Sequence, residues 1–209
     1  MKSVDGEVLM SNILIAFYSR DGSTEALANA VADGAMAGGA GVRIRRAREF
    51  VDETVMAQAP GWAEQAERMN AAYEEPTADD AIWADGIIFG TPTRFGLVSS
   101  ELKAYIDSLG ALWARGKLAG KVGSAFSSTS TVHGGNEMTN FTLYIPMAHF
   151  GMIIVPPGYA DGAMFKAGTP YGATSISHGP EQCKPDDLAL DVARFQGQRV
   201  AEVARKLKG

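Results

Sequence analysis

A short strand that ends in a run of hydroxyl residues is the part of this sequence best suited to chemistry. The apolar run from Ile13 to Tyr18 predicts a strand buried on both faces, and helical spacing follows over Glu25 to Ala37. The turn between them offers amide and hydroxyl donors at a helix N-terminus, where the helix dipole favours an anion. Its residues are Ser19, Arg20, Asp21, Gly22, Ser23 and Thr24. Because the turn has no Walker lysine, it favours a phosphomonoester, as on flavin mononucleotide (FMN), over a magnesium-bound triphosphate. The alternative is an ordinary turn with a Ser/Thr cap.

Two more polar loops follow predicted strands. Gly86–Phe89 leads into a loop that displays amides, hydroxyls, a guanidinium and an aromatic ring, and a proline stops the strand there. That loop consists of Thr91, Pro92, Thr93, Arg94, Phe95 and Gly96. Gly123–Phe126 leads into a third loop, which consists of Ser127, Ser128, Thr129, Ser130, Thr131, Val132, His133, Gly134 and Gly135. The alternative for Arg94 and Phe95 is a surface pair with a packing ring.

Strands and helices alternate between these loops. Val42–Arg46 alternates apolar and basic residues, which is typical of an outer strand, and Met152–Val155 supplies a fifth strand. Helices are predicted over Ser99–Ser108, over Asn136–Phe150 with a kink or break at Pro146, and over Asp186–Leu207. This order predicts an α/β fold, a doubly wound five-stranded parallel sheet with helices on both faces. The loops 19–24, 91–97 and 127–135 then share its carboxyl edge, where open α/β sheets bind ligands.

The expected organisation is one domain over residues 12–209, because 209 residues with 46% hydrophobic content can bury one substantial core. Residues 1–11 are expected to form an N-terminal extension, with Met10 as an alternative start. Surface insertions are expected at about 49–78, with a helix over Pro60–Tyr73, and at about 156–185, which reads as irregular. The charges of the first insertion are expected to form a solvated face without chemistry.

Composition excludes several classes of partner. A net charge of -5 disfavours nucleic acid and anionic membrane surfaces. No apolar run is long enough to span a bilayer, and Met1–Met10 carries acidic residues where a signal peptide has an apolar core, so a cytoplasmic location is expected. The lone Cys183 can form no internal disulfide.

Other site chemistries lack their sequence markers. Gly116-Lys117 has the wrong spacing from Gly110 for a P-loop, and neither a GxGxxG turn nor a GxSxG elbow is present. The three histidines are too scattered, without matched carboxylates, to propose zinc. No metal site is therefore predicted.

Six segments together resemble a known family. They are GTPTRFG (90–96), Leu112-Trp113, HGG (133–135), Ala148-His149, GTPYGA (168–173) and ARFQG (193–197). The sequence from Asn12 onward resembles the WrbA-type NAD(P)H:quinone oxidoreductases of the flavodoxin-like superfamily. The resemblance implies a flavodoxin-like fold, an FMN held non-covalently by the three loops, and a homotetramer.

The resemblance also implies roles for individual residues. Ser19 to Thr24 would hold the FMN phosphate, the 92–96 loop would line one side of the flavin, and Ser128 to Gly134 the other. His149 would join the flavin site at a subunit interface, and Trp113 would cover the substrate pocket. The sequence departs from the family pattern in the 49–78 segment and at Val132-His133, where some members have only glycine.

Two departures concern the substrates. Asp21 stands where many members carry a tyrosine near the nicotinamide nucleotide, and an acid there is expected to weaken NADPH binding more than NADH binding. Phe150 replaces a frequent second histidine and is expected to retune the substrate pocket beside Trp113.

The resemblance implies an FMN-dependent enzyme that takes hydride from NADH or NADPH and reduces quinones to hydroquinones by two electrons, with ping-pong kinetics. FMN would carry the chemistry, so no catalytic side chain is predicted. Two alternatives stay open: a flavodoxin-type carrier of single electrons, and a flavin reductase of nitro or azo compounds.

Overall fold

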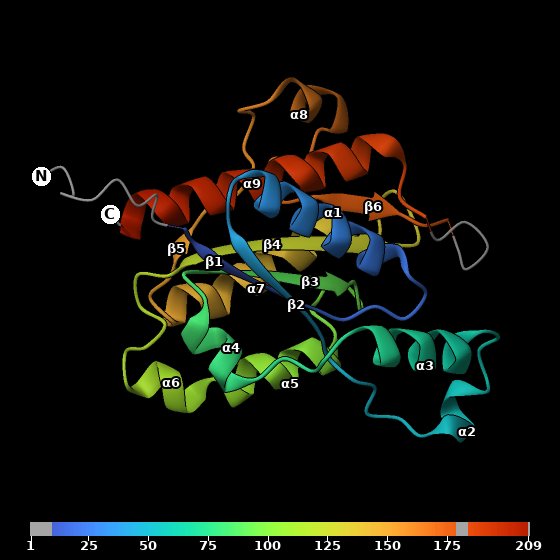
Figure 1. The fold of residues 1–209 in the computed structure, drawn as a ribbon. Helices are drawn as coiled ribbons and strands as arrows, with labels where there is room; N and C mark the ends of the chain where they lie inside the picture. Colours follow the sequence, from blue (N-terminus) through green and yellow to red (C-terminus); the bar gives the residue numbers. More distant parts are fainter. Residues whose placement is uncertain (1–9, 179–183, 209) are drawn as a thin grey trace, which may run out of the picture.

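A parallel β-sheet forms the centre of the molecule (Figure 1). The computed structural model describes residues 10–178 and 184–208, so most of the expected N-terminal extension and Cys183 lie outside the described residues. The strand order β2-β1-β3-β4-β5 is that of flavodoxin-like doubly wound sheets, which confirms the predicted fold class. The strands are β1 (Asn12–Phe17), β2 (Gly41–Arg46), β3 (Gly86–Pro92), β4 (Val122–Thr129), β5 (Ile153–Ile154) and β6 (Thr174–Ile176).

Two short strands share the position beside β4. β5 pairs with the start of β4 at Val122 and Gly123, and β6 pairs in parallel with its end, Ser127 to Thr129. Because β6 and helix α8 (Gly162–Ala167) lie within the 156–185 segment, the prediction that this segment is irregular is wrong there. A three-residue strand carries no periodic pattern, and its ladder with β4 defines it.

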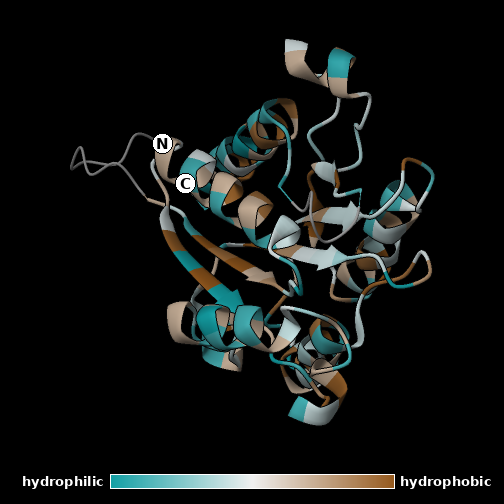
Figure 2. Cartoon of the chain, turned by 90° about the vertical axis from the view of Figure 1, so that its right-hand side faces the viewer, coloured by the Kyte–Doolittle hydropathy of each residue, from teal (hydrophilic) through white to brown (hydrophobic). Residues whose placement is uncertain are grey.

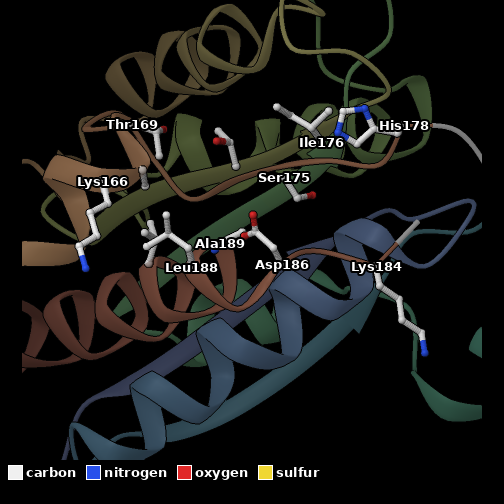
Figure 3. Close-up of a pocket in the computed structure, with 12 residues that line it drawn as sticks. Lys166, Thr169, Ser175, Ile176, His178, Lys184, Asp186, Leu188 and Ala189 are labelled. Atoms are coloured by element: carbon white, nitrogen blue, oxygen red, sulfur yellow. Dashed lines mark hydrogen bonds between the residues drawn. The ribbon is translucent and has the colours of Figure 1, made fainter. Parts of the chain in front are cut away.

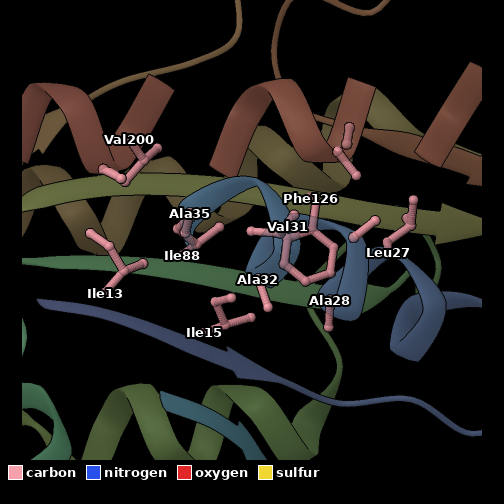
Figure 4. Close-up of a cluster of buried hydrophobic side chains, with 14 of the residues drawn as sticks. Ile13, Ile15, Leu27, Ala28, Val31, Ala32, Ala35, Ile88, Phe126 and Val200 are labelled. Atoms are coloured by element: carbon pink, nitrogen blue, oxygen red, sulfur yellow. The ribbon is translucent and has the colours of Figure 1, made fainter. Parts of the chain in front are cut away.

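Helices cover both faces of the sheet (Figure 1). On one face lie α1 (Ser23–Ala37) and α9 (Asp187–Lys208); on the other lie α4 (Ala78–Trp83), α5 (Ser100–Ser108), α6 (Gly110–Ala114) and α7 (Asn136–His149). Side chains of β1 alternate between the two layers: Ile13 and Ile15 pack with α1 and α9 (Figure 4), whereas Leu14 packs with α5 and α7. Burial on both faces explains the uninterrupted apolar run. Helix α7 continues through Pro146, so of the predicted kink or break the break is wrong.

Strand β2 lies at the edge of the sheet, as predicted, and its alternating apolar and basic residues give the brown and teal bands in Figure 2. Arg43 and Arg45 of this strand pair with Asp80 of α4 at 3.0 and 3.1 Å. Burial alone would raise the pKa of Asp80, but hydrogen bonds from Thr77, Arg45 and Arg43 outweigh it and hold the pKa below its usual value. The ion pairs therefore fix the edge strand to the α4 layer.

The crossing of α1 over α9 is a backbone-to-backbone contact. A Cβ atom on Gly34 would lie 1.8 Å from the Arg194 carbonyl oxygen, and one on Gly197 would lie 1.9 Å from the Val31 carbonyl oxygen. Each helix therefore needs a residue without a side chain where it meets the other.

The 49–78 segment folds as α2 (Glu53–Met56) and α3 (Trp62–Ala72), close to the predicted helix. In Figure 1, α3 lies at the end of the sheet to which the strand arrows point. Its Arg68 pairs with Glu25 in the first turn of α1. The Arg68 side chain is still half exposed, whereas that of Glu49 is 5% exposed and pairs with Arg46, so the prediction that the charges of this segment form a solvated face is wrong at Glu49.

Candidate functional site

The three predicted loops meet at the carboxyl edge of the sheet around a small cavity of about 60 Å³, called here the polar cavity. Parallel strands bring their following loops to one edge, so the convergence follows from the topology. The lining residues are Ser19, Arg20, Asp21, Ser23 and Thr24 of the first loop, Pro92, Thr93 and Arg94 of the second, Ser128, Thr129 and Ser130 of the third, and Ser177.

The backbone N–H groups at the start of α1 have no side-chain hydrogen-bond partner among the residues that the structure describes. Gly22 precedes α1 with φ 95°, a conformation that favours glycine, and the helix has no side-chain cap bond at its N-terminus. The Gly22 N–H donates to Ser19 Oγ at 3.1 Å, which closes the turn. The first-turn amides of α1 are left for an anion.

Hydroxyl groups in and beside the polar cavity pair with one another. Ser23 Oγ lies 2.8 Å from Ser175 Oγ, and Thr24 Oγ1 lies 2.8 Å from Ser128 Oγ. All four residues are buried, and each hydroxyl can turn its proton toward a new acceptor. Neutral donors of this kind, together with an uncapped helix N-terminus, fit the phosphomonoester of FMN.

Ser175 and Ser177 contribute to this region although no role was predicted for them. Residues two apart on a strand point to the same face, so Ser-Ile-Ser places both hydroxyls on the side of the first loop. Ser177 is also held by its N–H to the Thr129 carbonyl oxygen at 2.8 Å. The sequence shows this alternation of serines just after GTPYGA. Their place beside the first loop could not be inferred from it, because it depends on the pairing of β6 with β4.

The second loop ends in a strained turn. The Arg94 N–H donates to the Leu97 carbonyl oxygen at 2.9 Å, and the Leu97 N–H returns the bond at 3.0 Å. Between them, Phe95 and Gly96 have φ 56° and 81°, the pattern of a type I′ turn, which prefers Asn-Gly. A phenylalanine in this region costs about 1–2 kcal/mol, and its ring is fully exposed. Phe95 itself does not line the polar cavity, unlike its neighbour Arg94.

Thr93 connects the second loop to the third. Its N–H donates to the Ser128 carbonyl oxygen at 2.8 Å, and its Oγ1 accepts from the Gly96 N–H at 3.0 Å and from Thr139 Oγ1 at 2.9 Å. Arg94 Nη1 donates to the Thr93 carbonyl oxygen at 3.0 Å. Among the described residues, no carboxylate lies within ion-pair distance of the Arg94 guanidinium, which therefore brings an uncompensated positive charge to the polar cavity.

The third loop divides between two cavities. Ser128 to Ser130 face the polar cavity, whereas Val132 and His133 line a second cavity of about 530 Å³ that extends to Met138 and Phe141 of α7. Thr131 holds the division in place: its carbonyl oxygen accepts from Thr129 Oγ1 at 2.8 Å and from the Gly134 N–H at 3.0 Å. The geometry thus brings only the first half of the predicted loop to the phosphate side.

Trp113, His149 and Phe150 lie together in a third place, an apolar groove of about 370 Å³ between α6 and the end of α7. The Trp113 indole N–H donates to the His149 carbonyl oxygen at 2.8 Å. None of the three lines the polar cavity of the same chain. Asp21 does, and its carboxylate is paired with Arg20 at 3.0 Å. Hydrogen bonding to Asp21 raises the pKa of Arg20 above its usual value.

A further cavity, between the β6 segment and the start of α9, contains none of the predicted site residues (Figure 3). Its lining includes Lys166, His178 and Asp186. In the part of the chain that the structure describes, no group of three or more His, Cys, Asp or Glu could hold a metal ion. Within residues 10–178 and 184–208, no helix combines the length and the apolar character needed to cross a membrane.

Comparison with known proteins agrees with this geometry. The model of the NADPH-dependent FMN reductase family matches residues 13–165. NAD(P)H dehydrogenase (quinone) of Cupriavidus metallidurans is 44% identical over 96% of this chain and 100% of its own length, and that of Sinorhizobium fredii is 45% identical over 95% and 99%. The crystal structure of the flavodoxin, WrbA-like protein from Agrobacterium tumefaciens has a TM-score of 0.65 at 27% identity and covers 94% of this chain and 98% of that one. The chain therefore belongs to the NADPH-dependent FMN reductase family, as a relative of the NAD(P)H dehydrogenase (quinone) proteins, and the resemblance seen in its motifs is confirmed.

Proposed function

We propose that the protein is an FMN-dependent NAD(P)H:quinone oxidoreductase. The observation that carries this proposal is the polar cavity: amides and neutral hydroxyls converge at the carboxyl edge of the sheet, as a phosphomonoester requires. Family membership adds the substrates, because the quinone dehydrogenases are the relatives that align over nearly the whole chain.

The side chains supply binding and charge. Bound FMN supplies the hydride chemistry, since its ring can accept two electrons and pass them on. The first-turn amides and Ser23 and Thr24 hold the phosphate, Thr93 and Phe95 line one side of the ring, and Arg94 stabilises negative charge. Ser128, Thr129 and Ser130 line the other side of the ring, whereas Val132 and His133 face the second cavity. Asp21 is paired with Arg20, so its effect on NADPH binding is smaller than a lone carboxylate would produce.

FMN should bind with one molecule per chain and about tenfold tighter than FAD, because hydrogen bonds to a charged phosphate contribute about 1.5–3 kcal/mol and a buried monoester site leaves no room for the adenylate. Flavin fluorescence titration of the apoprotein measures both affinities. Equal or tighter FAD binding would contradict the phosphate site.

The FMN-loaded protein should oxidise NADH much faster with benzoquinone than without it, and the kinetics should be ping-pong. A nitro or azo acceptor that is reduced faster than benzoquinone would favour the alternative reductase.

One feature of this structure, the apolar groove, distinguishes the proposed enzyme from the electron-carrier alternative. A carrier needs only an FMN edge for its protein partner, whereas this chain keeps Trp113, His149 and Phe150 in an apolar groove of about 370 Å³ that a carrier does not require. We therefore favour the enzyme.

The single cysteine of the sequence permits no internal disulfide, which supports a cytoplasmic location.

We propose further that the active protein is a homotetramer whose subunits complete one another's sites. The outer faces of α6 and α7 and the end of the second loop expose apolar side chains that the described part of the chain leaves uncovered, and exposed apolar faces mark interfaces. They are Leu97, Trp113, Met138, Phe141 and Ile145. The groove of Trp113, His149 and Phe150 then lies where a neighbouring subunit's flavin site can meet it, and closed symmetry would repeat the pocket four times.

Specific activity should fall on dilution in step with dissociation, which light scattering on a sizing column measures. Mixing Trp113→Ala chains with chains disabled in the first loop by Ser23→Ala and Thr24→Val should restore some activity, because hybrid pockets combine an intact loop with an intact groove. Each variant alone serves as the control. A fully active monomer would refute the shared pocket.

A further inference from the structure

Behind the first loop lies an arginine that no solvent reaches. Arg46, the last residue of β2, is 0% exposed. Its guanidinium donates to both carboxylate oxygens of Glu49, with Nη1 to Oε2 at 3.2 Å, and stacks 5.4 Å from the Tyr18 ring. A buried charge needs a partner, and Glu49 neutralises this one. The same guanidinium also bonds to a backbone group of the loop.

That bond fixes the direction of one peptide plane. Arg46 Nη2 donates to the Ser19 carbonyl oxygen at 2.9 Å. In a trans peptide the carbonyl of Ser19 and the N–H of Arg20 point in opposite directions. With the carbonyl held toward Arg46, the Arg20 N–H points away from it, and both residues of this peptide line the polar cavity. A rotation of the plane would turn a carbonyl oxygen toward an anion.

Helix α3 holds this arrangement from the outside. Asn70 Oδ1 accepts from Arg46 Nη1, and Arg68 donates to Glu25 in the first turn of α1. The Arg20 guanidinium lies 5.4 Å from the ring centre of Trp62. The segment that departs from the family pattern is thus attached to the loop and to the helix that begins after it.

We propose that Arg46 is a positioning residue for the FMN phosphate: it orients the Ser19–Arg20 peptide from behind the loop, and Asn70 of α3 holds Arg46 in place. Arg46 does not line the polar cavity and acts only through the loop. The inference rests on the proposed FMN site.

The test compares FMN with riboflavin, which lacks the phosphate. The ratio of the two dissociation constants, measured by flavin fluorescence with apoprotein, reports the phosphate contribution alone. The double variant Arg46→Met/Glu49→Gln removes the donor without leaving a buried carboxylate unpaired. It should weaken FMN binding about tenfold, the loss of one charge-assisted hydrogen-bonded arrangement, and leave riboflavin binding unchanged. The control is Arg43→Met on the same strand, whose side chain pairs with Asp80 and stacks 4.2 Å from Trp83, outside the polar cavity; it should change neither constant.

A ratio that stays at the wild-type value in the double variant overturns the role of Arg46. A wild-type protein that binds FMN no tighter than riboflavin overturns the phosphate site itself, so the two failures are distinguishable. If circular dichroism shows that the double variant does not fold, Asn70→Ala decides the question by the same ratio, since it removes the bond from α3 that holds Arg46 Nη1 while the ion pair with Glu49 remains. It should lower FMN affinity in the same direction, and an unchanged ratio there overturns the proposal.

Discussion

Gly34→Ala should lower the free energy of unfolding by about 3 kcal/mol or more. Alanine is the best helix former and would by propensity gain up to about 1 kcal/mol over glycine in an exposed helix. Here its Cβ would lie 1.8 Å from the Arg194 carbonyl oxygen of α9, and a backbone atom cannot turn aside as a side chain can. The two helices must separate, which opens the core they share with the sheet.

Urea denaturation followed by circular dichroism measures the effect. Gly162→Ala is the matched control, because Gly162 also lies in a helix but a Cβ there would have no heavy atom within 4 Å. It should leave the midpoint unchanged or raise it slightly. Because α1 carries Ser23 and Thr24, FMN binding should weaken with Gly34→Ala as well. An unchanged midpoint in Gly34→Ala would show that the α1–α9 crossing is looser than the structure has it.

Arg94→Ala should lower the midpoint potential of the bound flavin by roughly 30–65 mV, the equivalent of about 1.5–3 kcal/mol for a two-electron couple. The direction follows from charge: a cation stabilises the negative charge of the reduced form, so its removal makes reduction harder. The Arg94 guanidinium is half-buried, bonds to the Thr93 carbonyl oxygen at 3.0 Å and, within the described chain, has no carboxylate to offset it.

Spectroscopic titration against a reference dye measures the potential. Arg94→Lys keeps the positive charge, so its midpoint potential should lie close to that of the wild-type protein. If the guanidinium geometry mattered and the charge did not, Arg94→Lys and Arg94→Ala would have the same lowered potential. Circular dichroism confirms that the fold is intact. A potential that does not change in Arg94→Ala would make Arg94 an ordinary surface residue.

Local patterns predicted the elements that carry the polar cavity. The apolar run of β1, the hydroxyl-rich turn and the helical spacing of α1 are neighbours in sequence, so their order determines their arrangement. The placement of three loops at one edge followed from parallel strands joined by helices. The family motifs added FMN and the quinone substrates, which no spacing of residues could identify.

The tertiary structure decided which residues share a cavity. Ser175 bonds to Ser23 of the first loop, 152 residues away in sequence, only because β6 pairs with the end of β4. The third loop divides at Thr131 because of bonds that form within the folded turn. Trp113 and His149 meet across 36 residues, in a groove apart from the phosphate side.

The sequence by itself determined the fold class, the three loops and the kind of ligand that they suit, because strand pattern, turn chemistry and helix start are properties of adjacent residues. It did not determine the strand β6, the attachment of α3 to the first loop, or the close contact of Gly34 with α9. Those depend on contacts between residues that are far apart in the sequence. Such contacts produce no periodic pattern in the residues around either partner. For Arg46 the local sequence indicated only a basic residue on an outer strand, and the folded chain turned it inward against Ser19.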